Sequence, residues 1–324
     1  MCYKYIVLPL ALVVGLLTWP ASGQDTPRRS IVATTGMVAD LARNIAGDRA
    51  TVVSIMGEGV DPHLYKPKAA DVRRILAADV VLYNGLKLEG RMGDVFKRAK
   101  AKGLPVHAVT ATLPEDLLLV DVESPDHPDP HVWMDVKTWA AAVEGVTKVL
   151  CEADLEGCPT YRANAQAYVA RLRELNRRVT ATMRSIPKDQ RVLVTAHDAF
   201  QYLGRAYGLE VRGIQGLSTE SEAGLSDLNE LVDFLVERKI PAVFIESSVS
   251  PKNVQALIEG ARARGHEVIV GGELYSDAMG QPGTPAGTYV GMIEHNMNTI
   301  AAALGGEPYV PEPDPGASPG TEGS

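Results

Sequence analysis

Two short segments of the sequence carry the same rare tripeptide, in which an aspartate and a proline precede a histidine. The segments are GVDPHLYKP and PDPHVWMD, and their histidines are His63 and His131. The proline holds its φ at about −65° and stiffens the chain beside the imidazole. The aspartate can accept a hydrogen bond from the ring and select its tautomer, as partners of metal-binding histidines do. The repetition argues against two unrelated loop histidines, which either one alone would suggest.

Two further candidates lie after strands that we expect to be buried. His197 follows a β-branched run in VLVTAHDAF, and Asp277 follows a glycine-rich segment in GGELYSDAMG. Ligands of open α/β sheets bind at the carboxyl ends of their parallel strands. Three neutral imidazoles and one carboxylate suit a divalent transition metal. The predicted metal ligands are therefore His63, His131, His197 and Asp277. For Asp277, a helix N-cap or turn position is an open alternative.

The other polar candidates have simpler explanations. His127 could belong to a metal-capturing loop, but a solvated loop histidine is the better interpretation. Glu246, at the end of a strand in FIESS, could orient a ligand, or it could make a cap or an interlobe hydrogen bond. We expect structural roles for His107 and His295, and a surface turn position for His266, which follows Gly265.

The elements that must position these residues follow an α/β pattern. In the first half of the chain, β-branched runs alternate with helical stretches, which predicts a parallel sheet covered on both faces. The predicted strands are Ile31–Thr35, Thr51–Met56, Val80–Asn84 and Val106–Val109, and the predicted helices are Met37–Ala46, Lys68–Ala77 and Glu89–Lys102.

The same order recurs after residue 190, so we expect a second α/β lobe of similar build. Its predicted strands are Val192–Ala196, Val211–Ile214, Ala242–Glu246 and Glu267–Val270, and its predicted helices are Ala199–Tyr207, Leu225–Arg238, Asn253–Ala263 and Gly287–Leu304. Between the lobes, one apolar stripe at helical spacing runs through Tyr161–Ile186 and predicts a single long, rigid helix.

These patterns divide the chain into five parts. The expected parts are a signal peptide (1–23), an N-terminal lobe (30–158), a linking helix (160–187), a C-terminal lobe (190–305) and a disordered tail (306–324). The tail is rich in Pro, Gly and acidic residues and has no periodicity.

The first 23 residues have the pattern of a secretory signal. Lys4 precedes an apolar run that is shorter than the roughly 20 residues a membrane-spanning helix needs. Cys2 would be removed with this segment and does not lie at a cleavage junction, so we expect a free periplasmic protein and not a lipoprotein. The mature chain is expected to be a monomer that does not insert into the membrane.

Composition and cysteine usage agree with an exported globular protein. The 324 residues are 45% hydrophobic and 22% charged, and the formal net charge of −8 comes without a basic cluster. Nucleic acid is therefore an unsuitable partner. Cys151 and Cys158 form an even pair at short spacing, which in an oxidising compartment predicts a disulfide. Two unpaired thiols at a helix end are the alternative, and Gly157 and Pro159 predict a turn there.

Taken together, the motifs resemble a known family. DPHLYKP, DPHVWMD, VTAHDAF, FIESS and GGELYSDAMG, with GTYVGMIEHN behind them, are similar to the cluster A-I metal-binding proteins of ABC transporters, the TroA-like zinc and manganese solute-binding family. The match runs from about residue 30 to 305. It implies two α/β lobes joined by one rigid helix, and a single metal bound between them and passed to a membrane permease. It places the family's ligands on His63, His131, His197 and Asp277.

The sequence differs from two groups of family members at positions that concern the choice of metal. Manganese-specific members of streptococcal type have a glutamate where this chain has His197. Zinc importers of enteric type have a long His-rich insertion before the second ligand, where this chain has only SPDHPD. The choice between zinc and manganese therefore stays open.

Two other functions fit part of the pattern. A secreted zinc hydrolase would need an open metal position and a general base such as Glu58 or Glu246. Four protein ligands and the lack of an HExxH sequence argue against it. An adhesin-like surface protein would need an anchor, which the cysteine pattern does not provide. We expect a binding protein and not an enzyme.

Overall fold

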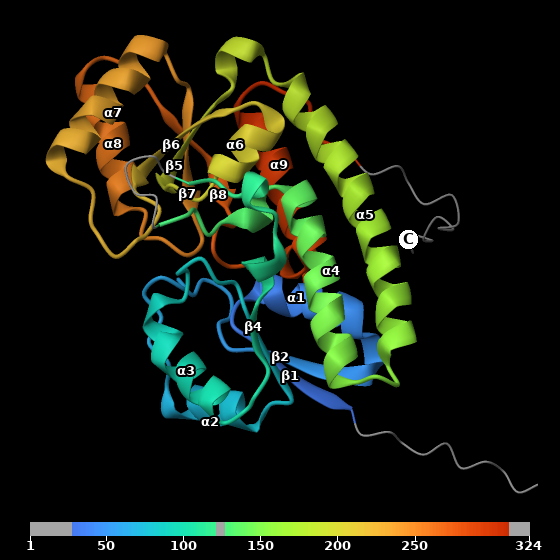
Figure 1. Cartoon of the computed structure of the whole chain (residues 1–324). Coiled ribbons are helices and arrows are strands. Elements are labelled where there is room, and N and C mark those ends of the chain that lie inside the picture. The colour runs from blue at the N-terminus through green and yellow to red at the C-terminus, as the bar shows by residue number, and fades with distance from the viewer. Residues whose placement is uncertain (1–27, 121–126, 311–324) are drawn as a thin grey trace, which may run out of the picture.

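Two α/β lobes and a long helix beside both of them make up the molecule (Figure 1). The computed structural model describes residues 28–120 and 127–310. The expected signal peptide lies outside these residues. Of the expected tail, only 306–310 are described, and they have no regular secondary structure.

The N-terminal lobe is built on one parallel sheet in the order β2-β1-β3-β4. Successive residues of β1 face opposite sides, so Ile31 and Val32 belong to two different clusters of the core. Helix α1 packs on one face, and α2 and α3 cover the other (Figure 1). The prediction of a parallel sheet buried on both faces is confirmed. The elements are β1 (Arg29–Ala33), α1 (Gly36–Ala46), β2 (Ala50–Ser54), α2 (Ala69–Ala77), β3 (Val80–Tyr83), α3 (Gly93–Ala101) and β4 (Val106–Ala108).

The C-terminal lobe differs from the N-terminal one in its sheet. Its strands form two parallel pairs, β5-β6 and β7-β8, with β5 lying against β7. The expectation of two lobes of similar build therefore holds for the βα order and not for the pairing. The elements are β5 (Val192–His197), α6 (Gln201–Tyr207), β6 (Glu210–Gln215), α7 (Leu225–Arg238), β7 (Ala242–Glu246), α8 (Lys252–Ala263), β8 (Ile269–Leu274) and α9 (Tyr289–Ala303).

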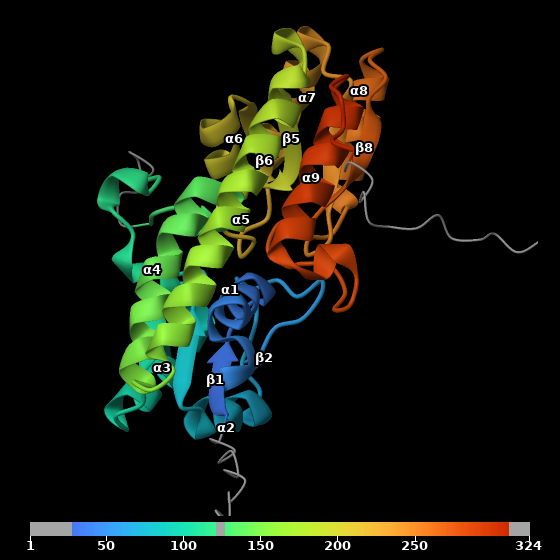
Figure 2. The same ribbon diagram turned by 90° about the vertical axis from the view of Figure 1, so that its right-hand side faces the viewer.

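The linking helix is α5 (Cys158–Ser185), which is 28 residues long. It runs along the whole molecule, beside α4 at one end and α9 at the other (Figure 2). The predicted stripe, which includes Leu172, Leu175 and Val179, is fully buried. Because this stripe belongs to the same core cluster as residues of both lobes, α5 is part of the core of each.

One helix was missing from the expected elements. Helix α4 (Val136–Ala153) follows the second DPH motif directly and packs along α5. Asp135 caps it by accepting from the backbone N–H of Lys137 at 2.9 Å. The disulfide Cys151–Cys158 joins the end of α4 to the start of α5. Pro159, expected in a turn, instead lies in the first turn of α5, where its missing N–H costs nothing.

Two predicted boundaries are also wrong. The single helix expected over Glu89–Lys102 is divided into a 3₁₀ turn, Gly90–Met92, and α3. The last strand begins at Ile269 and extends to Leu274, through the glycine pair that follows the expected end at Val270. Both errors concern glycines, whose backbone freedom weakens pattern-based boundaries.

Candidate metal centre

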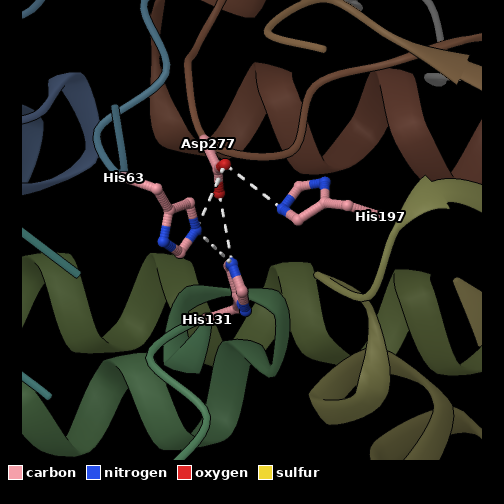
Figure 3. Close-up of side chains that lie close together, drawn as sticks. All are labelled: His63, His131, His197 and Asp277. Atoms are coloured by element: carbon pink, nitrogen blue, oxygen red, sulfur yellow. Dashed lines mark hydrogen bonds and ion pairs between the residues drawn. The ribbon is translucent and has the colours of Figure 1, made fainter. Parts of the chain in front are cut away.

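Four side chains from both lobes meet at one buried point (Figure 3). His63 and His131 come from the N-terminal lobe, and His197 and Asp277 come from the C-terminal lobe. Their ligand atoms all lie within 4.8 Å of one another. His63 is 6% exposed, Asp277 is 1% exposed, and the other two are fully buried. The structure thus brings together all the residues that the sequence singled out as ligands.

The distances suit a metal ion between the donors. Asp277 Oδ2 lies 3.2 Å from His197 Nε2 and 3.6 Å from His63 Nε2, and Oδ1 lies 3.3 Å from His131 Nε2. The Nε2 atoms of His63 and His131 are 3.4 Å apart. Bonds of about 2.0–2.1 Å to a tetrahedral ion place donor atoms about 3.3 Å apart. The four side chains therefore surround a space of the size that one such ion needs.

Each of the two DPH motifs uses its aspartate to fix the chain. Asp129 Oδ1 accepts the backbone N–H of His131 at 2.8 Å and faces the ring Nδ1 at 2.7 Å. Asp61 Oδ1 accepts the backbone N–H of His63 at 2.8 Å. The predicted contact between aspartate and ring thus forms at His131, whereas Asp61 holds the main chain of His63. In both motifs the short side chain closes a turn that presents the imidazole.

His197 is the last residue of β5, and Glu246 is the last residue of β7. Glu246 accepts the backbone N–H of His197 at 2.8 Å and lies 2.5 Å from its ring Nδ1. Of the alternatives that the sequence left for Glu246, this contact favours the orientation of His197. Because the ring binds Glu246 through Nδ1, its Nε2 faces the centre of the site.

Asp277 lies in the loop after β8 and does not cap a helix. Among the described residues, neither of its oxygens makes a hydrogen bond, and neither does His197 Nε2; these atoms meet only at the ion-pair distances given above. Buried polar atoms without partners are rare in native proteins, because losing water without compensation costs about 1–3 kcal/mol each. Donor atoms left unsatisfied at a common point suit a cation between them.

Burial and neighbouring charges shift the pKa of each candidate ligand. Burial opposes protonation of His131, but Asp129 and Asp277 outweigh it and raise its pKa to about 9. Burial likewise opposes protonation of His197, yet Glu246 and Asp277 raise its pKa well above the usual value. Burial alone would raise the pKa of Asp277, and the neighbouring histidines instead hold it well below its usual range. At His63 burial dominates and lowers the pKa to about 4. The site therefore attracts positive charge at its centre.

The remaining histidines lie away from this point. His127 is exposed, as expected for a solvated loop residue. His266 Nε2 lies 2.8 Å from the carbonyl of Ile240, and His295 Nε2 lies 2.9 Å from that of Glu273. His107 is partly buried in β4, where burial lowers its pKa. These contacts give the last three histidines structural roles.

Sequence reasoning missed the residues that join the lobes beneath the site. Trp133 donates from Nε1 to the carbonyl of Ser276 at 2.9 Å, and Tyr289 donates to the carbonyl of Trp133 at 2.7 Å. Both aromatic side chains are fully buried. The signal was present, because Trp133 stands two residues after His131 and Ser276 stands next to Asp277. These bonds tie the second and fourth candidate ligands to each other across the interface.

Comparison with known proteins shows the family of the chain. Residues 31–303 match the family model described as ZnuA, zinc-uptake complex component A, periplasmic. The zinc-binding protein TroA of Treponema pallidum is 49% identical over 276 residues, which cover 85% of this chain and 88% of TroA. The manganese-binding lipoprotein MntA of Bacillus subtilis is 47% identical over 303 residues, which cover 92% of this chain and 98% of MntA.

The solved structures are similar in the same way. The periplasmic zinc-binding protein TroA from Treponema pallidum superposes with a TM-score of 0.83 at 48% identity, covering 86% of this chain and 99% of that one. The sequence resemblance to the TroA-like family and the expected fold class are thereby confirmed. With the family model matching nearly all of the described residues, the chain belongs to the ZnuA family of periplasmic zinc-uptake components.

Proposed function

We propose that this protein captures one divalent transition-metal ion, zinc or manganese, and delivers it to the membrane permease of an ABC importer. The observation that carries the proposal is the convergence of four buried donor groups from two lobes. Membership of the zinc-uptake family and the metals named for TroA and MntA support it. The proposed ligands are His63, His131, His197 and Asp277.

The ligand set favours zinc in intrinsic affinity. Three imidazole nitrogens follow the Irving–Williams order, in which zinc stands above manganese. Manganese prefers more oxygen ligands, which here come from Asp277, whose two oxygens both face the histidines. We expect zinc to displace manganese in a competition titration at pH 7.5, whichever ion the cell imports.

The protein is proposed to act as a binding component and not as a hydrolase. Four protein donors complete a tetrahedral zinc site, whereas a catalytic zinc keeps a position open for water. Glu246, which a hydrolase could use as its base, is bound to His197. Hydrolysis of test esters or peptides that depends on added zinc would contradict this part of the proposal.

We further propose that the chain is exported and works as a monomer without a lipid anchor. No helix within residues 28–120 and 127–310 has the length and apolar character to cross a bilayer. Some relatives are lipoproteins, MntA among them. The intact mass of the protein from its native host would distinguish cleavage near residue 23 from lipid attachment, and light scattering would give the oligomeric state.

The central test is a zinc titration of protein stripped with EDTA. We expect one zinc ion per chain and a rise in the melting temperature. A ligand at about 1,000 times its dissociation constant adds roughly 4 kcal/mol to the native state. His63→Ala, His131→Ala and His197→Ala should each weaken binding strongly. Failure of both zinc and manganese to bind or to shift the melt would refute the proposed function.

A further inference from the structure

We propose that Thr219 and Glu220, which contact the opposite lobe, position His63 and set the rate at which the metal leaves the site. This inference rests on the proposed function. Both residues lie between β6 and α7 of the C-terminal lobe. Their partners, Asp61 and Arg91, belong to the N-terminal lobe, and we call these four residues the clasp.

The four candidate ligands are not held equally firmly. The loops of His131 and Asp277 are joined by the buried bond from Trp133 to Ser276, and His197 is held at both its backbone and its ring by Glu246. His63 is the most exposed of the four. Its imidazole is therefore the ligand that can leave the metal with the least disturbance of the core.

The first clasp contact reaches the main chain of His63 through a single carboxylate. Thr219 donates from Oγ1 to Asp61 Oδ2 at 2.5 Å, and Asp61 Oδ1 accepts the backbone N–H of His63 at 2.8 Å. Thr219 is only 9% exposed. A buried hydroxyl of the C-terminal lobe thus fixes the turn that presents a ligand from the N-terminal lobe.

The second contact holds the other side of the same turn. Arg91 donates from Nε to Glu220 Oε1 at 2.9 Å and from Nη1 to the carbonyl of Leu64 at 3.3 Å. The ion pair is well exposed, and such pairs are individually weak. Through Arg91, however, it joins Glu220, the neighbour of Thr219, to Leu64, the neighbour of His63. Both contacts therefore connect the same two segments of the chain.

Opening of the clasp would free His63 first. Loss of either contact would weaken the hold of the opposite lobe on the 61–64 turn, while the other three ligands would keep their buried supports. The metal would then be held by three ligands and exposed to solvent on the side of His63. We infer that the clasp slows release more than it determines whether the metal binds.

The test measures zinc release from the full chain loaded with one zinc ion, mixed rapidly with excess EDTA. Thr219→Val removes the hydroxyl at nearly constant shape, and we expect release to become about tenfold faster, the effect of one ordinary hydrogen bond. Thr219→Ser keeps the hydroxyl and should release zinc at close to the wild-type rate. Ser226→Ala is the control, because Ser226 bonds to Glu230 within its own helix.

Glu220→Gln tests the second contact on an exposed side chain, where folding is not at risk. We expect a smaller acceleration of release, and a release rate less sensitive to salt than that of the wild type. Glu210→Gln is its control, since Glu210 pairs with Arg212 and Arg238 inside the C-terminal lobe. That variant should release zinc at the wild-type rate.

The outcomes separate this inference from the proposed function. If Thr219→Val and Glu220→Gln each bind one zinc ion and release it at the wild-type rate, the clasp is refuted and the metal site stands. If the wild type binds no zinc, the proposed function fails instead. If Thr219→Val does not fold, the release rate of Glu220→Gln decides alone.

Discussion

At the scale of single residues, the carboxylates that contact Nδ1 of two histidines affect metal binding as well as the donor atoms that face the site. Asp129 faces Nδ1 of His131, and Glu246 faces Nδ1 of His197. Such partners fix the tautomer and raise the basicity of the ligating nitrogen, and their loss costs about 10- to 100-fold in metal affinity. They explain why two buried imidazoles are preset for coordination through Nε2.

We therefore predict that Glu246→Gln weakens zinc binding by about 10- to 100-fold while the fold is kept. Glutamine retains the shape and one acceptor but loses the negative charge beside the ring, and its NH₂ group replaces one of the two oxygens that accept from His197. A competition titration with a chelator of known affinity measures the change. Glu259→Gln, on the exposed side of α8, is the matched control. Equal affinities for the two variants would mean that the charge of Glu246 does not matter.

The protonation states predict how binding depends on pH. Coordination requires neutral imidazole, and the pKa of about 9 at His131 and the raised pKa of His197 mean that protons occupy both rings of the metal-free site at neutral pH. The metal must displace these protons, so affinity should rise with pH up to about 9. His63, with a pKa of about 4, is already neutral and adds little to this dependence.

The same argument revises the expectation from unperturbed histidines, whose competition with the metal would begin only below roughly pH 6. Because the pKa of both His131 and His197 is raised, calorimetry at pH 7.5 in buffers of different ionisation enthalpy should detect protons released when zinc binds. Zinc binding without proton release at this pH would contradict the assigned protonation states.

Whether a contact of the site can be predicted from the sequence depends on how far apart its two residues lie along the chain. The candidate ligands stand in motifs that are recognisable one by one, and the aspartates of the DPH motifs are local. Thr219 contacts Asp61, and Trp133 contacts Ser276, only because the chain folds. Thr219 and Ser276 are of common residue types, and the position of Trp133 two residues after His131 places it near the site without identifying its partner. The local sequence therefore does not predict which residues these side chains contact.

At the scale of elements, a buried carboxylate supports the loop after β3. Glu89 accepts from Thr34 Oγ1 at 2.6 Å and from the backbone N–H groups of Asn84 and Gly85 at 2.7 and 3.2 Å. Residues 85–87 all have positive φ, which is costly for the leucine and the lysine among them. Asn84 in turn donates to the carbonyl of Pro130, next to His131, at 3.0 Å.

Replacing Glu89 by glutamine should destabilise the metal-free protein by about 1–3 kcal/mol. One oxygen of Glu89 accepts from Thr34 and Asn84 and the other from Gly85, so a glutamine NH₂ would point a donor at a donor. Urea unfolding measures the loss. Glu115→Gln at an exposed position should leave the midpoint unchanged. A wild-type midpoint for Glu89→Gln would show that the loop does not depend on this carboxylate.

The disulfide between α4 and α5 is the second element-scale prediction. Its cysteines close a short loop worth about 2.5 kcal/mol in the chain-entropy model. We expect reduction to lower the stability of the joint between the two helices by an amount of this order. Exported protein is alkylated without reductant and its intact mass is measured. We expect neither Cys151 nor Cys158 to carry the alkyl group, because bridged cysteines have no free thiol. Two alkylated thiols would exclude the bridge there.

The sequence contains a signal for helix α4, which was not expected, but none for the pairing of the C-terminal strands. Helix α4 has buried apolar residues at helical spacing, among them Val136, Trp139, Val143, Val146 and Leu150. That pattern was in the sequence and would have predicted the helix. The pairing of the C-terminal strands had no such signal, because a βα order fixes the parallel direction but not which strands hydrogen-bond.

At the scale of the whole molecule, the site depends on two lobes held in one position. Helix α5 runs along both lobes (Figure 2) and packs into the core of each. The Trp133–Ser276 bond and the clasp also join the two lobes. Two lobes, the linking helix and the four converging ligands were all expected from the sequence and the family resemblance. The cross-lobe bonds were not, since no spacing along the chain encodes them. We propose that the expected boundaries, 30–158, 160–187 and 190–305, divide the mature chain into its two lobes and the helix that links them.

The most direct test of the central claim is the position of zinc in crystals of the loaded protein, measured by anomalous scattering at the zinc absorption edge. We predict one strong peak per chain, about 2.0–2.2 Å from Nε2 of each histidine and from a carboxylate oxygen. The coordinating residues should be His63, His131, His197 and Asp277. A strong peak at any other place, or no peak in protein that has bound zinc in solution, would contradict the account.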